Sequence, residues 1–212
     1  PGGGAGLLEA RQLGERWQSL AEVLTSLGAE QPQPTAAGGL EATLNWRGRQ
    51  LVLAHTGKPR PAQRLELWLA LLLSCSAGQQ PSRAVLVGRD NHTFRVMESL
   101  APLPASEAES HLAQLRELRE RHRSGCWPVP PVSGWSWAEA EQRKPGSGFR
   151  AAQGSWEGGF GRSAEREQEV MALCFGAELS TADLLDGRFE QAALALFTPL
   201  LAQHTSVKAA GQ

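Results

Sequence analysis

The chain has 212 residues, a formal net charge of −1 and 41% hydrophobic residues, which is typical of one large or two small soluble globular domains. The near-neutral charge excludes a global attraction to nucleic acid or to a membrane surface, so any contact with DNA has to come from a local basic patch. No stretch reaches the ~20 apolar residues of a membrane span. Three cysteines without metal-binding spacing predict buried free thiols in a reducing compartment such as the cytoplasm: Cys75, Cys126 and Cys174.

The first third of the chain predicts a helix, a linker and two strands. An apolar stripe with steps of three and four residues runs from Leu13 to Leu27 and includes Trp17, which predicts an amphipathic helix that ends at Gly28. Pro32, Pro34 and the pair Gly38-Gly39 predict a linker. Residues 40–46 and 50–55 predict two strands joined by the tight turn 47–49.

The remaining elements predict a mixed α/β fold. Residues 65–74 are apolar on almost all sides, so we expect a buried central helix with Trp68 in the core. Residues 84–88 and 93–97 predict a second hairpin. Ser106, with Glu109 three residues later, predicts a capping box at the start of the next helix. Further helices are expected near residues 136–142, 164–175 and 183–203. This order favours one mixed β-sheet flanked by helices.

Residues 38–73 have the layout of the PD-(D/E)xK nuclease core: a strand, a turn, a second strand ending in Thr-Gly, and a buried helix with an aromatic residue. Active members carry one acid on the first strand and an acid-x-Lys triplet on the second, because Mg²⁺ needs converging carboxylates and the Lys lies beside the attacking water. Here Leu53 stands at the acidic position and His55 at the Lys position. Glu41 is the remaining acid on the first strand, and a solvent-facing strand residue explains it equally well. We therefore expect a nuclease-like core with a degenerate active site and no catalytic residue, metal or cofactor.

Three other motifs are weak candidates. The segment 134–138 approaches a Gly-x-Ser-x-Gly nucleophile elbow, but the prolines before it exclude the required strand, so Ser133 or Ser136 is better explained as a helix N-cap. His122 and Cys126 lack a second ligand pair for a zinc site. Residues 158–161 lack the Lys and the preceding strand of a phosphate-binding loop, so we expect a flexible connector.

Several segments, taken in order, resemble the C-terminal domain of RecC, the gamma subunit of exodeoxyribonuclease V. The similar segments are Pro1-Gly2 before the first helix, residues 64–69 and 75–78 of the central helix, residues 82–87, 100–103, 127–130 and 135–138, and the closing motif 171–176. Two segments depart from the family: the chain is short around residues 31–35, and residues 161–166 lack the acidic cluster expected before Met171. The resemblance implies that residues 1–212 form a nuclease-like domain that is a fragment of a larger subunit.

The resemblance also implies a function. The RecBCD helicase–nuclease processes double-strand DNA ends for recombination, and RecC grips the other two subunits and helps to split the duplex. A domain of this kind is expected to be non-catalytic, to have RecB and RecD as partners, and to meet the duplex end and the separated strands.

Four basic residues flank the second predicted strand, and they are the candidate DNA contacts: Arg47, Arg49, Lys58 and Arg60. Ordinary solvated turns explain them equally well. Two other functions stay open. An active nuclease requires a metal near Glu41, and a pure protein-interaction scaffold requires no DNA contact at all.

Overall fold

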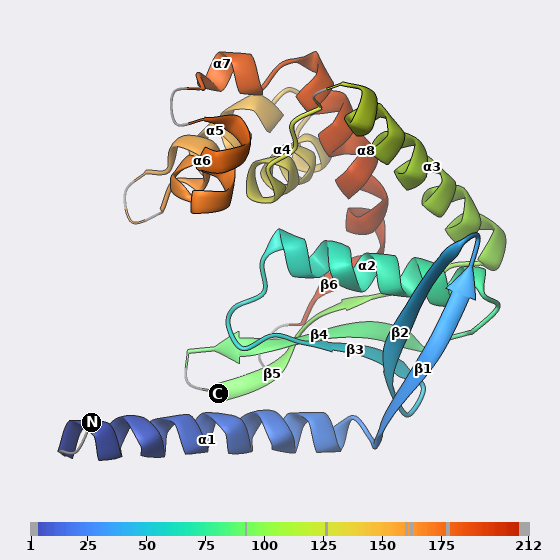
Figure 1. The fold of residues 1–212 in the computed structure, drawn as a ribbon, viewed down its shortest axis with the longest axis vertical. Coiled ribbons are helices and arrows are strands. Elements are labelled where there is room, and N and C mark those ends of the chain that lie inside the picture. Colours follow the sequence, from blue (N-terminus) through green and yellow to red (C-terminus); the bar gives the residue numbers. More distant parts are fainter. Residues whose placement is uncertain are drawn as a thin grey trace. The chain divides into compact units, whose positions relative to one another are not determined.

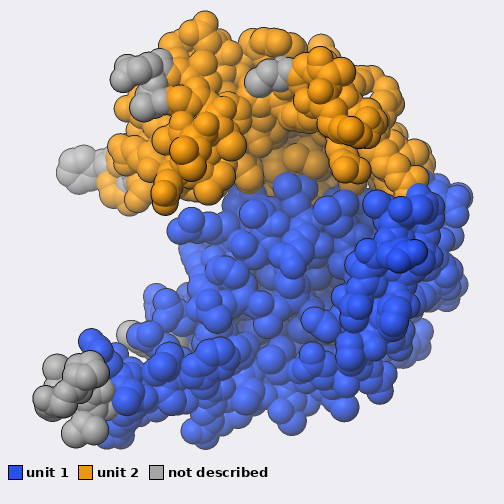
Figure 2. All heavy atoms as spheres, in the orientation of Figure 1, with its two compact units in different colours: residues 1–109, 204–212 blue, residues 110–203 orange. Residues whose placement is uncertain are grey.

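The computed structural model describes residues 4–91, 93–125, 127–159, 161, 163–176 and 179–207. The chain divides into two compact units (Figure 2). Unit 1 comprises residues 1–109 and 204–212, and unit 2 comprises residues 110–203. Unit 2 is therefore inserted into the chain of unit 1. Within the described ranges, no helix combines the length and the apolar character that a membrane crossing requires.

Unit 1 is built on a six-stranded mixed sheet with the order β1-β2-β3-β4-β5-β6 (Figure 1). The strands are β1 (Glu30–Ala37), β2 (Leu40–Arg47), β3 (Gln50–Ala54), β4 (Arg83–Asp90), β5 (Thr93–Leu100) and β6 (His204–Ser206). Strands β3 and β4 are parallel, and every other neighbouring pair is antiparallel. The mixed sheet and both predicted hairpins are confirmed.

Strand β1 corrects the prediction of a linker. Pro32 and Pro34 pair with Asn45 and Thr43 of β2. The strand lies at the edge of the sheet, where proline is tolerated because its missing N–H group faces away from the ladder. Gly38 and Gly39 have φ values of +55° and +77°, as a two-residue hairpin turn with two left-handed residues requires.

Helices cover both faces of the sheet. Helix α1 (Gly4–Ser26) places Leu20 against Val52, Val85, Val87 and Phe94 on one face. Helix α2 (Pro61–Ser76) packs against β1 to β4 from the other side. Trp68 of α2 is 1% exposed, which confirms it as a core residue. Strand β4 is buried on both faces, as a parallel neighbour between two helical layers should be.

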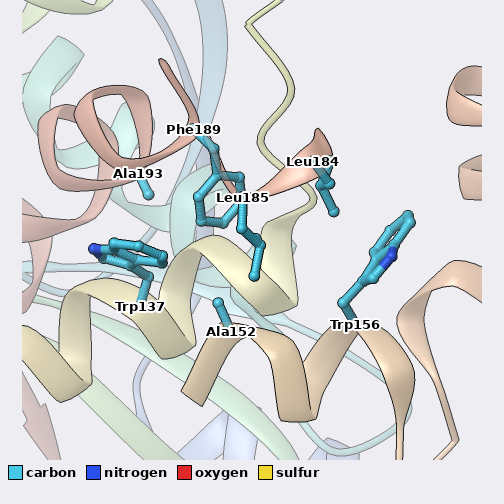
Figure 3. Close-up of a cluster of buried hydrophobic side chains, with 7 residues drawn as sticks. All are labelled: Trp137, Ala152, Trp156, Leu184, Leu185, Phe189 and Ala193. Atoms are coloured by element: carbon cyan, nitrogen blue, oxygen red, sulfur yellow. The ribbon is translucent and has the colours of Figure 1, made fainter. Parts of the chain in front are cut away.

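Unit 2 is helical. Its elements are most of α3 (Ala105–Ser124), then α4 (Pro131–Arg143), α5 (Gly148–Glu157), the 3₁₀ helix η1 (Glu165–Glu167), α6 (Glu169–Phe175), α7 (Thr181–Leu184) and α8 (Gly187–Gln203). Its core is aromatic: Trp137 of α4, Trp156 of α5 and Phe189 of α8 gather with alanines and leucines from α5, from α8 and from α7 and the residue after it (Figure 3). Trp137 and Phe189 meet edge to face with ring centroids 5.5 Å apart.

Several local predictions were wrong. Helix α3 begins at Ala105, so Ser106 lies inside the first turn and does not form the expected capping box. The residue before α4 is Pro130, so neither Ser133 nor Ser136 is an N-cap. Helix α5 and strand β6 were not expected. Cys75 is buried as expected, but Cys174 is exposed, on a helix in which no residue is buried. Cys126 lies outside the described residues, as does Phe160 of the expected connector.

Candidate functional site

The candidate nuclease positions on and after β2 and β3, which are Glu41, Leu53 and His55, lie apart from one another. Trp46 of β2 pairs with Leu51 of β3, and successive residues of a strand point to opposite faces. Leu53 therefore shares a face with Leu51, whereas Glu41 falls on the other face and is exposed. His55 follows β3, and its Nδ1 atom accepts a hydrogen bond from the N–H of Gly57 at 3.1 Å. These three positions do not converge on one point.

The other motifs singled out in the sequence do not assemble into a metal or nucleophile site. Among the described ranges, no group of three or more His, Cys, Asp or Glu side chains could hold a metal ion. The segment that approached a nucleophile elbow lies inside α4, where Ser136 Oγ is 2.7 Å from Ser155 Oγ. His204 belongs to unit 1 and pairs with Glu98. Ser136 and His204 therefore take part in separate contacts, each within its own unit.

Arg47 is bound to the end of helix α1. Its guanidinium donates hydrogen bonds to the carbonyl oxygens of Leu24 and Gly28 at 3.1 and 2.9 Å, and to Glu30 Oε2 at 2.8 Å. The Arg47 side chain is only 13% exposed. It satisfies carbonyl groups that the helix end leaves without partners, so Arg47 joins α1 to β2.

The other three basic candidates are exposed, at two places. Arg49 lies in the turn that precedes β3, whereas Lys58 and Arg60 lie in the loop that follows it. Five strand residues separate the two places by about 17 Å, at ~3.3 Å per residue. The four residues therefore do not form one patch. Arg60 is the N-cap of α2, and its N–H donates to Gln63 Oε1 at 3.1 Å.

Arg49 borders a pocket of about 320 Å³. The other walls come from the end of α2, including Cys75 and Gln79, and from the segment that leads into α3, including Pro102 and Pro104. Burial raises the pKa of the Cys75 thiol, and a hydrogen bond with the Leu103 backbone opposes that rise. The thiol therefore has little thiolate character for nucleophilic chemistry.

A buried ionic network was missed at the sequence level. Glu98 of β5 receives two hydrogen bonds from Arg64 of α2, at 2.7 and 2.6 Å, and lies 2.9 Å from Nε2 of His204 in β6. Burial by itself would raise the pKa of the Glu98 carboxyl, but hydrogen bonds and charge from His204 and Arg64 outweigh it and lower the pKa to about 2. Arg64 at the start of a largely apolar helix was the available signal. Its partner is 34 residues away and could not be read from periodicity.

A second buried carboxylate supports the start of helix α4. Glu165 of η1 is 2% exposed. It accepts hydrogen bonds from the N–H groups of Val132 and Ser133 at 2.8 and 2.7 Å, and from Ser133 Oγ at 2.7 Å. Burial raises the pKa of this carboxyl, and the three hydrogen bonds oppose the rise. Glu165 thus takes the role of the N-cap that Pro130 cannot supply.

The comparison with protein families gives one match. Residues 1–142 match the family described as the RecC C-terminal domain. The match covers α1 through all but the last residue of α4, so it includes strands β1 to β5 and helix α2. It does not extend to residues 171–176, where the sequence had suggested a closing motif. No curated protein sequence matches the chain.

Proposed function

Because the chain belongs to the RecC C-terminal domain family, we propose that it is a non-catalytic domain of a RecBCD-type complex that assists subunit assembly and the handling of DNA ends during unwinding. Membership of the family assigns the chain to the RecBCD complex, with RecB and RecD as partners, and to DNA repair. The observation that carries the proposal is the family match over residues 1–142. A cytoplasmic location and an extent over all 212 residues are parts of the proposal.

A nuclease-like core is supported by the order of the elements. Strand β2, a two-residue turn, strand β3 and the buried helix α2 follow one another as in the PD-(D/E)xK layout. Arg64 and Trp68 stand where that layout carries a Gln and a Tyr. Arg64 is engaged with Glu98, and Trp68 is buried, so both residues contribute to packing and charge balance.

A non-catalytic role is supported by Leu53, His55 and Glu41. A two-carboxylate magnesium site needs ligands that converge, and the single acid of β2 points away from the face that carries Leu53. We expect the purified chain to leave linear DNA intact with Mg²⁺ or Mn²⁺. Cleavage that disappears in Glu41→Ala would favour the alternative of an active nuclease.

DNA handling is proposed for Arg49, Lys58 and Arg60. Lys58 and Arg60 precede the first turn of α2, where the helix dipole disfavours cations and favours anions. A phosphate group at this place would interact with both the side chains and the helix N-terminus. Arg47 is left out of the proposal because its guanidinium is engaged with α1.

The test is DNA unwinding by the assembled complex. We expect the triple variant Arg49→Ala, Lys58→Ala, Arg60→Ala to assemble normally with RecB and RecD and to unwind duplex DNA more slowly. A matched control removes three other exposed arginines, each on a helix and paired with a nearby acid: Arg11, Arg143 and Arg188. Unwinding at the normal rate by the first variant would favour the second alternative, a scaffold without DNA contact.

A further inference from the structure

The apolar stripe of helix α1 continues beyond the core that it covers. Leu20 is buried at 7% exposure, whereas Trp17 and Leu13, about one and two turns earlier on the same stripe, are 56% and 53% exposed. Figure 1 shows α1 running along one face of the sheet and extending past it toward its N-terminus. Large apolar side chains aligned in this way mark an interaction surface.

These side chains form the floor of a groove of about 190 Å³ in unit 1. Leu13, Trp17 and Leu20 line it from α1, and Phe94 lines it from β5. Thr56, from the loop that also carries Lys58, lines the groove as well. We call this surface the α1 groove.

The rim of the α1 groove is positively charged. Arg16 and Arg89 line it on the α1 side and the β4 side. Neither guanidinium has an ion pair or hydrogen bond with another described residue, and no acidic side chain of the described chain lines the groove. Two half-buried cations beside an apolar floor favour a ligand that carries both apolar groups and negative charge.

We propose that the α1 groove binds an amphipathic helix of a partner protein. Its apolar side chains fill the floor between Trp17 and Phe94, and acidic side chains on the two flanks of its apolar stripe pair with Arg16 and Arg89. The inference rests on the assembly part of the proposed function and gives the chemistry of one partner segment. A protein helix fits better than a nucleobase, because the floor offers hydrocarbon and a buried base edge would lose its hydrogen bonds to water without replacement.

The experiment uses two designed, fluorescently labelled helical peptides and the 212-residue chain. Both peptides carry Leu and Phe at positions i, i+3, i+4 and i+7, and the flanks carry Glu in one peptide and Lys in the other. Fluorescence anisotropy should show binding of the Glu peptide with a Kd on the order of 10 µM. The Lys peptide should bind at least about tenfold more weakly, which corresponds to ~1.4 kcal/mol.

Two variants make the test specific. Arg16→Glu combined with Arg89→Glu should reverse the preference between the two peptides. Trp17→Ala should weaken binding of the Glu peptide at least about tenfold. The thermal unfolding temperature should stay unchanged, since Trp17 is exposed. A matched control, Val170→Ala with Leu173→Ala, removes exposed apolar side chains of α6 in unit 2 and should leave binding unchanged.

Three results would overturn the proposal. The first is no binding of the Glu peptide up to about 1 mM, which would mean a binding free energy weaker than ~4 kcal/mol. The second is equal binding of both peptides. The third is binding of an oligothymidylate that Trp17→Ala abolishes, which would assign the groove to single-stranded DNA. None of these results depends on assembly or unwinding by the whole complex, so the proposed function is judged separately.

Discussion

Within the described part of each unit, a single carboxylate is buried, and the two carboxylates are held differently. In unit 1, Glu98 faces two basic side chains, Arg64 and His204. In unit 2, Glu165 accepts hydrogen bonds from three neutral groups: two backbone N–H groups and one hydroxyl. The pKa of Glu98 is lowered to about 2, whereas burial raises that of Glu165.

The difference shows what a buried charge can do for each unit. Glu98 connects α2, β5 and β6, which are distant in sequence, so its ion pairs hold the sheet and its central helix in one arrangement. Glu165 connects η1 to the first turn of α4 and completes a helix end. The first arrangement depends on opposite charge, and the second depends on the helix dipole and on hydrogen bonds.

The largest loss of stability is expected from a substitution in the core of unit 1. Trp68→Ala should lower the free energy of unfolding by about 3–5 kcal/mol, because it opens a cavity in a fully buried site. Denaturant titration followed by circular dichroism measures the change. A loss below about 1 kcal/mol would mean that α2 does not form the centre of the unit.

Removing the charge of Glu98 should have the next largest effect. Glu98→Gln keeps the size of the side chain but leaves Arg64 without its buried counter-charge, and we expect a loss of about 3 kcal/mol in the same titration. Asp90→Asn is the matched control, since Asp90 pairs with Arg95 in a 41% exposed position. That control should cost about 0–1 kcal/mol. Equal losses in the two variants would remove the distinction between the buried network and a surface pair.

The two carboxylates should respond to pH in opposite directions. The pKa of Glu98 is lowered from 4.5 to about 2, so its contribution is present above pH ~4.5 and disappears as the pH falls to about 2. It amounts to about 3 kcal/mol. The pKa of Glu165 is raised, so its contribution is present below pH ~4.5 and decreases as the pH rises through the folded value.

Unfolding of the wild type and of the variants Glu98→Gln and Glu165→Gln, measured from pH 2 to 8, separates these contributions. The difference between the wild type and Glu98→Gln should grow with rising pH. The difference between the wild type and Glu165→Gln should shrink with rising pH. Parallel curves for the two variants would show that both carboxylates are held by the same kind of interaction.

The smallest effect is expected at Ser133. Ser133→Ala removes the hydroxyl that donates to Glu165 but keeps both backbone N–H donors, so we expect a loss of about 1.5–2 kcal/mol. Ser136→Ala is the control, because its hydroxyl bonds with Ser155 and not with a carboxylate. Thermal unfolding monitors both. A control variant that loses as much as Ser133→Ala would argue against a special role for Glu165.

Sequence patterns predicted the elements whose own residues carry the signal. The stripe from Leu13 to Leu27, the two hairpins and the apolar run around Trp68 are local patterns, and all are confirmed. Strand β1 was missed because its prolines are acceptable only at a sheet edge, and position in a sheet is a tertiary property. The extent of the exposed part of α1 also depends on where the sheet ends.

The candidate site was predictable only in part. The absence of an acid at position 53 is visible in the sequence. That Glu41 lies on the face of the sheet opposite to Leu53 follows only from the register of β2 and β3. The engagement of Arg47 with α1 depends on carbonyl groups up to 23 residues earlier. Glu98 and His204 are in contact although 106 residues separate them. Sequence periodicity cannot predict a contact between residues so far apart.

Strand β6 has a consequence for how the protein is synthesised. It pairs with β5 through Leu100 and His204, and all of unit 2 is translated between the two strands. At about 5–20 residues per second, the ribosome needs on the order of 5–20 s to cover that distance. During this interval β5 is an open sheet edge, and Glu98 faces Arg64 alone. A chaperone or a partner subunit that pairs with β5 on the ribosome has that time to bind before β6 takes its place.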